Sequence, residues 1–188
     1  NRNELVSFQD DEKKSGFFHA CKYGRSEIVQ AMINEDLVSK NEYAKAFLNL
    51  CQEKKKSADT MFAFFLTLPN KMDFVKTGFI PACESGSLLK VKSMMNPDLF
   101  SEADIARFIT SRDDKGRSSY SVASQNRHSV IERILLDALT NLFPYLTNSD
   151  FIHYFMHLDE TKLMTLLLSE ATLQNPVGNV KEAAFIYS

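Results

Sequence analysis

The chain contains an internal repeat, which constrains its fold more than any other feature. Residues 16–34 (GFFHACKYGRSEIVQAMIN) align without a gap on 78–96 (GFIPACESGSLLKVKSMMN), with eight of nineteen positions identical. The offset of 62 is twice 31, and FLNLCQEKKK at 47–56 lies about midway between the two copies. A period in the low thirties, with two short helices in each copy, is typical of an array of helical hairpins that bury their apolar faces against one another. We therefore predict an all-α solenoid of about five stacked helical hairpins.

The spacing of apolar residues within a copy supports this prediction. Phe17, Ala20 and Cys21 lie on one face of a predicted helix because they are three and four residues apart. Gly24 comes next, where a helix commonly ends on a residue with positive φ. The second predicted helix carries an apolar stripe of Ile28, Val29, Met32 and Ile33. Each copy is thus predicted to be one helical hairpin.

The repeats divide the chain into three parts. We expect residues 1–15 to be an N-terminal extension or cap, residues 16–168 to be the repeat domain, and residues 169–188 to be a C-terminal cap or tail. The repeats are placed near 16–34, 43–68, 78–96, 116–136 and 149–168. Residues 97–112 are predicted to be an insertion with one additional helix, from Ser101 to Ser111.

Three helix starts support these boundaries. Ser39, Ser101 and Thr147 each precede a carboxylate residue by three positions. This pattern is typical of an N-cap, whose hydroxyl accepts a hydrogen bond from a backbone N–H in the first turn. We expect a helix to begin directly after each of these residues.

A family pattern can be recognised in the fourth copy. It has the order D-x-x-G-x-T-P-L-x-x-A-x-x-x-G-H-x-x-I-V-x-x-L-L, and the chain matches it at Asp113, Gly116, Ala123, His128, Ile131, Leu135 and Leu136. The segments therefore resemble degenerate ankyrin repeats, which implies a solenoid of that kind. The chain lacks the Thr-Pro pair, and it has Arg127 in place of the helix-ending Gly and Glu132 in place of an apolar residue. A tetratricopeptide-like or HEAT-like solenoid is the alternative architecture.

The sequence offers little support for catalysis. Cys21, Cys51 and Cys83 recur at equivalent repeat positions, which predicts buried, reduced thiols rather than nucleophiles or a disulfide framework. His153 and His157 are four residues apart, but no Cys or carboxylate cluster accompanies them as in a zinc site. The sequence also has no phosphate-binding glycine motif and no G-x-S-x-G. We expect no catalytic residue, no metal and no cofactor.

Charge and hydropathy narrow the class of partner. The net charge of −2 and the pI of about 6.1 lack the basic footprint of a nucleic-acid binder. No stretch reaches the roughly 20 apolar residues that a membrane span needs. We expect a monomer that binds a protein of unknown identity, and neither nucleic acid nor a membrane. We place it in the cytoplasm, either of its own cell or of a host cell into which it is delivered as a secreted bacterial effector.

The resemblance implies that the concave face of the solenoid binds a partner protein. In ankyrin repeats the residues just before the helix-ending Gly and those at the hairpin tips face the partner. Those positions are Lys22, Tyr23, Arg25, Glu84, Ser85, Asp114, Lys115, Arg117, Gln125 and Asn126. Tyr23 and Arg117 are expected to contribute most, because Tyr and Arg are enriched among binding hot spots. The insertion at 97–112 is a second candidate surface. The alternative function is that of a targeting domain in a multidomain enzyme whose catalytic part lies outside this chain.

Overall fold

The computed structural model describes residues 8–142 and 145–146. It divides into two compact units, Asn1–Leu99 and Phe100–Ser188. The described residues form helices, turns and two isolated β-bridges, with no strand among them, so the predicted all-α class is confirmed for this part of the chain. The fifth predicted repeat (149–168), the helix start at Thr147 and the tail (169–188) lie outside the described residues.

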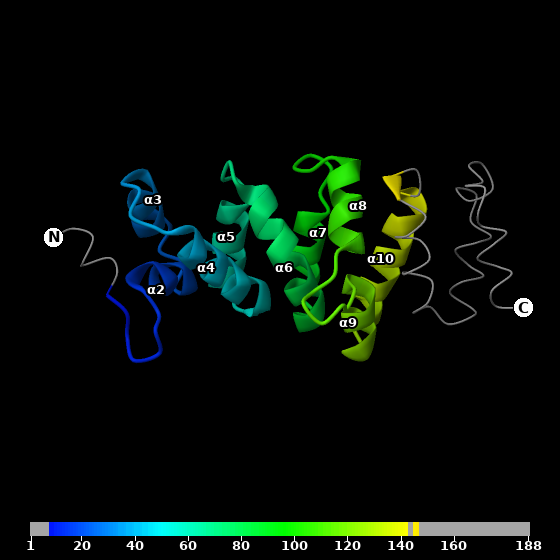
Figure 1. Cartoon of the computed structure of the whole chain (residues 1–188), viewed down its shortest axis with the longest axis horizontal. Coiled ribbons are helices and arrows are strands. Elements are labelled where there is room, and N and C mark those ends of the chain that lie inside the picture. Colours follow the sequence, from blue (N-terminus) through cyan, green and yellow to red (C-terminus); the bar gives the residue numbers. More distant parts are fainter. Residues whose placement is uncertain (1–7, 143–144, 147–188) are drawn as a thin grey trace, which may run out of the picture. The chain divides into compact units, whose positions relative to one another are not determined.

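The N-terminal unit contains helical hairpins that follow one another along the chain (Figure 1). They pair α2 (Gly16–Lys22) with α3 (Ser26–Asn34), α4 (Lys40–Gln52) with α5 (Lys56–Phe65), and α6 (Lys71–Ser85) with α7 (Leu88–Met94). Helix α4 contacts both α2 and α6, and α5 contacts both α2 and α7. We call these pairs the first, second and third hairpins. Within this unit they pack on one another in chain order.

Aromatic side chains fill the space between these hairpins. The ring centroid of Phe47 lies 5.2 Å from that of Phe62, 5.7 Å from that of Phe65 and 5.5 Å from that of Phe74. All four rings are buried, and burying a side chain of this size stabilises the fold by about 1.5–3 kcal/mol. Phe62, Phe65 and Phe74 are therefore core residues, whereas Phe64, also on α5, is half-buried.

The third hairpin begins earlier than the sequence predicts. The repeat alignment starts its first helix at Gly78, but α6 already begins at Lys71. Gly78 lies in the middle of this helix, and a Cβ there would come within 2.4 Å of Phe47 and 2.6 Å of Cys51. Glycine is needed at this position because α4 approaches α6 so closely. Gly16, its counterpart in the alignment, is by contrast the first residue of α2.

Turns between paired helices share one geometry at three places. Gly24, Gly86 and Arg127 have positive φ angles of 69°, 74° and 60°. Each donates its N–H to the carbonyl three residues earlier, and the residue after it donates to the carbonyl five residues before itself. These paired bonds are the Schellman motif that commonly ends a helix. The predicted role of Gly24 is confirmed, and Arg127 adopts the same conformation although its Cβ disfavours it.

Two of the three predicted helix starts lie in the described residues, and both are confirmed. Ser39 Oγ accepts a hydrogen bond from the Glu42 N–H, and the Glu42 carboxylate accepts one from the Ser39 N–H. This reciprocal pair is a capping box. Ser101 Oγ accepts a hydrogen bond from the Asp104 N–H in the same way.

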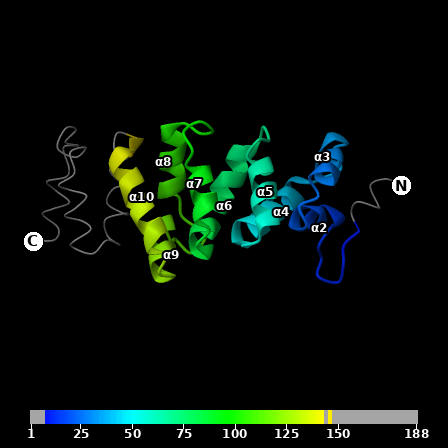
Figure 2. The ribbon, with the colours of Figure 1, turned by 180° about the vertical axis from the view of Figure 1, so that it is seen from behind.

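The C-terminal unit begins with the predicted additional helix, α8 (Glu102–Thr110). It contacts both α9 (Ser119–Gln125) and α10 (Ser129–Asn141), which form a hairpin (Figure 2). In this hairpin Glu132, which departs from the family pattern, has a structural role. Tyr120 is 1 % exposed and its hydroxyl donates to the Glu132 carboxylate at 3.4 Å. The carboxylate therefore supplies the acceptor that a buried tyrosine hydroxyl needs.

The same hydrogen-bonded turn precedes α2 and α9. Asp10 and Asp113 each accept two backbone N–H bonds on one carboxylate oxygen, and the main chain of each bonds to the residue four positions later. Lys13 and Gly116 occupy the position of positive φ in the two turns. The segment around Asp10, which the sequence places in an N-terminal extension or cap, therefore leads into the first hairpin.

Candidate functional site

Three of the predicted binding residues lie together at the turn between α2 and α3. Tyr23 is the C-cap of α2 and Arg25 the N-cap of α3, and both are exposed. The Tyr23 ring stacks on the His19 ring, with centroids 6.2 Å apart and planes 14° apart. The Lys22 ammonium lies 5.8 Å from the Tyr23 ring centroid. A ring held by its neighbours in this way can bind a partner with little loss of conformational entropy.

A hydrogen-bonded carboxylate fixes this aromatic stack. Asp10 Oδ2 lies 2.7 Å from His19 Nε2, and Asp10 Oδ1 accepts the N–H groups of Glu12 and Lys14, each at 2.9 Å. These bonds, first the one from the Lys14 backbone and then the one with His19, lower the pKa of Asp10. Sequence reasoning missed Asp10 and His19. The signal that could have found them is that Asp10 stands 103 residues before an aspartate in an equivalent turn.

The predicted residues of the third hairpin are less accessible. Glu84 and Ser85 are half-buried at the end of α6. Ser85 Oγ lies 3.0 Å from the carbonyl oxygen of Cys51, which belongs to α4, and 3.1 Å from that of Ala82 in its own helix. The Ser85 hydroxyl is therefore engaged between the second and third hairpins.

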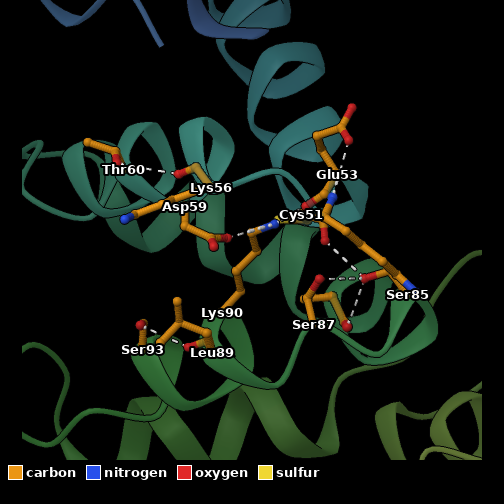
Figure 3. A network of polar contacts seen from close by, with 12 residues as sticks. Cys51, Glu53, Lys56, Asp59, Thr60, Ser85, Ser87, Leu89, Lys90 and Ser93 are labelled. Atoms are coloured by element: carbon orange, nitrogen blue, oxygen red, sulfur yellow. Dashed lines mark hydrogen bonds and ion pairs between the residues drawn. The ribbon is translucent and has the colours of Figure 1, made fainter. Parts of the chain in front are cut away.

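A buried lysine that the sequence analysis did not single out lies beside Ser85 (Figure 3). Lys90 on α7 is 1 % exposed. Its ammonium donates to the Glu53 carbonyl and lies 3.4 Å from Asp59 Oδ1. A buried ammonium needs such partners, because an unpaired buried charge is costly. The last carbonyls of a helix also lack partners within it, so Lys90 and Ser85 satisfy groups at the end of α4.

The C-terminal unit presents its predicted residues at both ends of α9. Asp114 and Lys115 are exposed at the tip of the turn that precedes the helix. Gln125 is the last residue of α9 and Asn126 its C-cap, and both are exposed. The Asn126 side-chain amide donates to the Val122 carbonyl at 2.8 Å. The Asn126 amide is therefore engaged at the end of its own helix.

Arg117, expected to contribute strongly to binding, is engaged inside its own turn. Its Nε donates to Asp113 Oδ2 at 2.7 Å, and its backbone N–H donates to Asp113 Oδ1 at 2.8 Å. Desolvation opposes ionisation of Asp113, but the hydrogen bonds from Arg117 outweigh it and lower the pKa of this carboxyl. The Arg117 side chain is 27 % exposed, so we assign it first to holding the turn.

The ten predicted residues thus fall into separate groups. Lys22, Tyr23 and Arg25 share one turn, and Asp114 and Lys115 share another. The two groups belong to different units, so a single concave face formed by all ten residues stays a prediction.

The cysteines are buried, as the sequence predicts. Cys21, Cys51 and Cys83 are free thiols with at most 1 % of their surface exposed. Burial raises the pKa of Cys21 to about 12 and also raises those of Cys51 and Cys83. A thiol that stays protonated at neutral pH is a poor nucleophile and a poor metal ligand.

The part of the chain that the structure describes holds neither a metal-ligating cluster nor a helix that could span a membrane. Between residues 8 and 146, outside the gap at 143–144, no three or more His, Cys, Asp or Glu residues group so that they could hold a metal ion. His153 and His157 lie outside the described residues. None of the described helices is both long and apolar enough to cross a membrane.

A shallow groove lies between the turn before α2 and helix α4. It encloses about 380 Å³, and Lys14, Phe18, Lys45 and Leu48 are among its lining residues. Lys14 forms an ion pair with Glu12, which also lines the groove. With charges of both signs, the groove offers no preference for an anionic or a cationic ligand.

No protein-family model matches the sequence, and no curated protein or solved structure matches it either. A function must therefore be inferred from the exposed side chains of the chain. Those of Tyr23, Asp114 and Lys115 are among them.

Proposed function

We propose that the chain is a protein-interaction module built of ankyrin-like hairpins. The observation that carries this proposal is the environment of Tyr23, which is 62 % exposed, stacked on His19 and flanked by Lys22 and Arg25. Large aromatic and arginine side chains are enriched among the residues that dominate protein–protein binding. Binding is favoured over catalysis because the three cysteine thiols are buried and protonated.

Local geometry supports the ankyrin-like part of this proposal. The turn from Asp113 to Arg117 lies where the family pattern has D-x-x-G, and Arg127 lies with positive φ where the pattern has its helix-ending Gly. The first and third hairpins also have a residue with positive φ at the end of their first helix, Gly24 and Gly86. On this proposal the partner contacts the turn residues of a solenoid whose hairpins stack in chain order.

The proposed site of action is the cytoplasm, of the cell of origin or of a host cell that receives the chain. Three free and buried cysteines agree with a reducing compartment.

Capture from a eukaryotic cytosolic lysate with the full chain as bait tests the proposal. Tyr23→Ala removes the exposed ring of the N-terminal unit, and Lys115→Glu reverses a charge at the exposed tip in the C-terminal unit. We prefer Lys115 to Arg117, because Arg117→Glu would set a second carboxylate against Asp113. Each variant is first checked for helix content by circular dichroism.

A protein that the parent retains and Tyr23→Ala releases is the expected result. Lys76→Ala, at an exposed residue of α6 outside the predicted set, is the control and should retain that protein. A bait that keeps the same proteins after both Tyr23→Ala and Lys115→Glu contradicts the assignment of these residues.

A further inference from the structure

The first hairpin exposes a position that is covered in the other hairpins to which the repeat alignment extends. Gly16 corresponds to Gly78 at the offset of 62. When Ala20 is aligned with Ala123 of the fourth copy, an offset of 103, Gly16 corresponds to Ser119. Among the described residues a Cβ on Gly16 would meet nothing within 4 Å, whereas one on Gly78 would collide with α4. Ser119 is 0 % exposed, and its hydroxyl donates to the Ile109 carbonyl of α8 at 2.8 Å.

The second helix of each hairpin shows the same contrast. Ile28 corresponds to Lys90 and Ile131 at these offsets. Ile28 is 54 % exposed, but Lys90 is 1 % and Ile131 2 % exposed. Met32 is half-buried, whereas its counterparts on α7 and α10 are fully buried. Ile28 belongs to the apolar stripe predicted for this helix, and none of the described residues covers that stripe at Ile28.

In both units the cover over these positions is the C-terminal end of a preceding helix. In the N-terminal unit it is α4, at whose end carbonyl groups accept hydrogen bonds from Ser85 and Lys90. In the C-terminal unit it is α8, whose Ile109 carbonyl accepts the hydrogen bond from Ser119. These contacts satisfy carbonyls that have no partner within their own helix, and both α4 and α8 carry buried apolar side chains.

We propose that the open face of the first hairpin, formed by Gly16, Tyr23, Ile28 and Met32, docks the C-terminal end of an amphipathic helix from a partner protein. This inference rests on the proposed function and specifies the kind of partner. The helix would lay a large apolar side chain over Gly16 and Ile28, as α4 lays Phe47 over the third hairpin. Its last carbonyls would meet the donors that this face offers, the Tyr23 hydroxyl and the two cations beside it.

Charge and length both favour such an occupant. The C-terminal end of a helix carries a partial negative charge, which complements Lys22 and Arg25. The covering helices within the chain have nine residues in α8 and 13 in α4. A helix of nine to 13 residues is therefore long enough to cover such a face.

The test supplies such a helix to the full chain. A second copy of residues 38–53, which contain α4, is joined to the N-terminus through a flexible Gly/Ser linker, which holds the probe at an effective concentration in the millimolar range. Amide hydrogen exchange in residues 16–34 is then followed by mass spectrometry. We expect exchange there to slow about tenfold relative to the unmodified chain, since covering a face raises the local opening free energy.

Matched variants locate the contact. Ile28→Glu in the chain should abolish the slowing, because it places a charge where the apolar side chain of the probe packs. Leu89→Glu, at a residue of α7 that is 60 % exposed, is the control and should preserve it. A probe copy that carries Phe47→Asp and Cys51→Asp should have no effect.

Other outcomes overturn the proposal. Equal exchange with the intact and the altered probe means that this face does not dock a helix, and slowing that survives Ile28→Glu means that the probe binds elsewhere. Sedimentation of the unmodified chain tests for self-association; a dimer that Ile28→Glu dissociates would assign the face to a second copy. Because the probe is supplied with the chain, failure here leaves the lysate capture, and with it the proposed function, unaffected.

Discussion

Ile28 and Lys90 occupy equivalent positions in the first and third hairpins, but their burial is the reverse of what side-chain type predicts. Ile28 is 54 % exposed on α3, whereas Lys90 is 1 % exposed on α7. The difference lies in the neighbouring hairpin. The second hairpin covers the third and supplies the Glu53 carbonyl and the Asp59 carboxylate to the lysine ammonium. Ile28 has no such cover among the described residues. Whether a side chain is buried therefore depends more on the presence of a neighbouring hairpin than on the polarity of the side chain.

Truncating the two side chains should give the largest contrast. Lys90→Ala leaves a cavity and removes the partner of two polar groups, so we expect the free energy of unfolding to fall by about 3 kcal/mol. Ile28→Ala shortens a side chain that is already half in water and should cost less than about 1 kcal/mol. Urea denaturation at pH 7, followed by circular dichroism, measures both losses. Lys90→Met keeps most of the volume and separates packing from hydrogen bonding. Equal losses for the two alanine variants would contradict the comparison.

Gly16 of the first hairpin and Gly78 of the third hairpin allow a second test of the same comparison. Gly78→Ala places a methyl group against Phe47 and Cys51, and we expect overpacking to lower the free energy of unfolding by about 2 kcal/mol. The added methyl group of Gly16→Ala meets no atom of the described residues within 4 Å, so this variant should raise the free energy of unfolding by about 0.5 kcal/mol, because alanine restricts the unfolded chain. The same urea titrations provide the measurement. A neutral Gly78→Ala variant would mean that α6 is free to move away from α4.

The hairpins were predictable from the sequence because the signals that build them are local. Gly24 ends a helix through its own backbone conformation, and Ser39 and Ser101 begin helices through bonds to residues three positions away. The start of α6 was not predictable, because the alignment equates Gly78 with a helix-starting glycine. What fixes Gly78 is contact with α4, which is distant in sequence.

The candidate site was predictable only in part, for the same reason. The resemblance identifies Tyr23 as an exposed residue, and the structure agrees. It gives no reason to bury Lys90, nor to engage Ser85 with the neighbouring hairpin, since both contacts reach to the end of α4. The turn that holds His19 was missed because Lys13 stands where its counterpart has glycine.

The Schellman turns allow a smaller comparison between glycine and arginine at one backbone conformation. Arg127 holds a φ of 60° that glycine adopts without strain. We expect Arg127→Gly to raise the free energy of unfolding by about 0.5–1 kcal/mol and Gly86→Ala to lower it by about 1 kcal/mol. Thermal denaturation at fixed chain concentration measures both shifts. If Arg127→Gly destabilises the chain, the arginine side chain contributes more than its backbone strain costs.

Cysteine modification compares the hairpins by local opening. Cys21 lies in the first hairpin, whereas Cys51 of the second hairpin and Cys83 of the third lie further from the open face. We expect N-ethylmaleimide to modify Cys21 about threefold faster, because a hairpin with one open face opens at lower free energy. Peptide mass spectrometry resolves the three rates. Burial raises the pKa of all three thiols, so at each pH between about 7 and 9 the native rates should lie below those of the urea-unfolded chain. Uniform rates would mean that the chain opens as one unit.

Acid titration makes the smallest comparison, between the turns before α2 and α9. Asp10 and Asp113 both have a pKa below the ordinary value of 3.8, so each stabilises the fold in its ionised form. This contribution is fully present above the unfolded-state pKa and is lost as the pH falls through the lower folded-state pKa. Asn substitutions cannot titrate, so each should lower the urea midpoint at pH 7 and flatten its decline between about pH 4 and pH 2.

The two aspartates should differ in the size of this effect. We expect the larger change from Asp113→Asn, because Asp113 holds both the backbone and the guanidinium of Arg117. Asp10 leads into the hairpin with an open face, where the same loss should matter less to the whole unit. Urea midpoints at pH 7, 4, 3 and 2.5 for the parent and both variants decide this. A larger loss from Asp10→Asn would mean that the first hairpin contributes as much to stability as the covered hairpins do. Its exposed Ile28 would then belong to a stable end of the stack and not to a docking face for a helix.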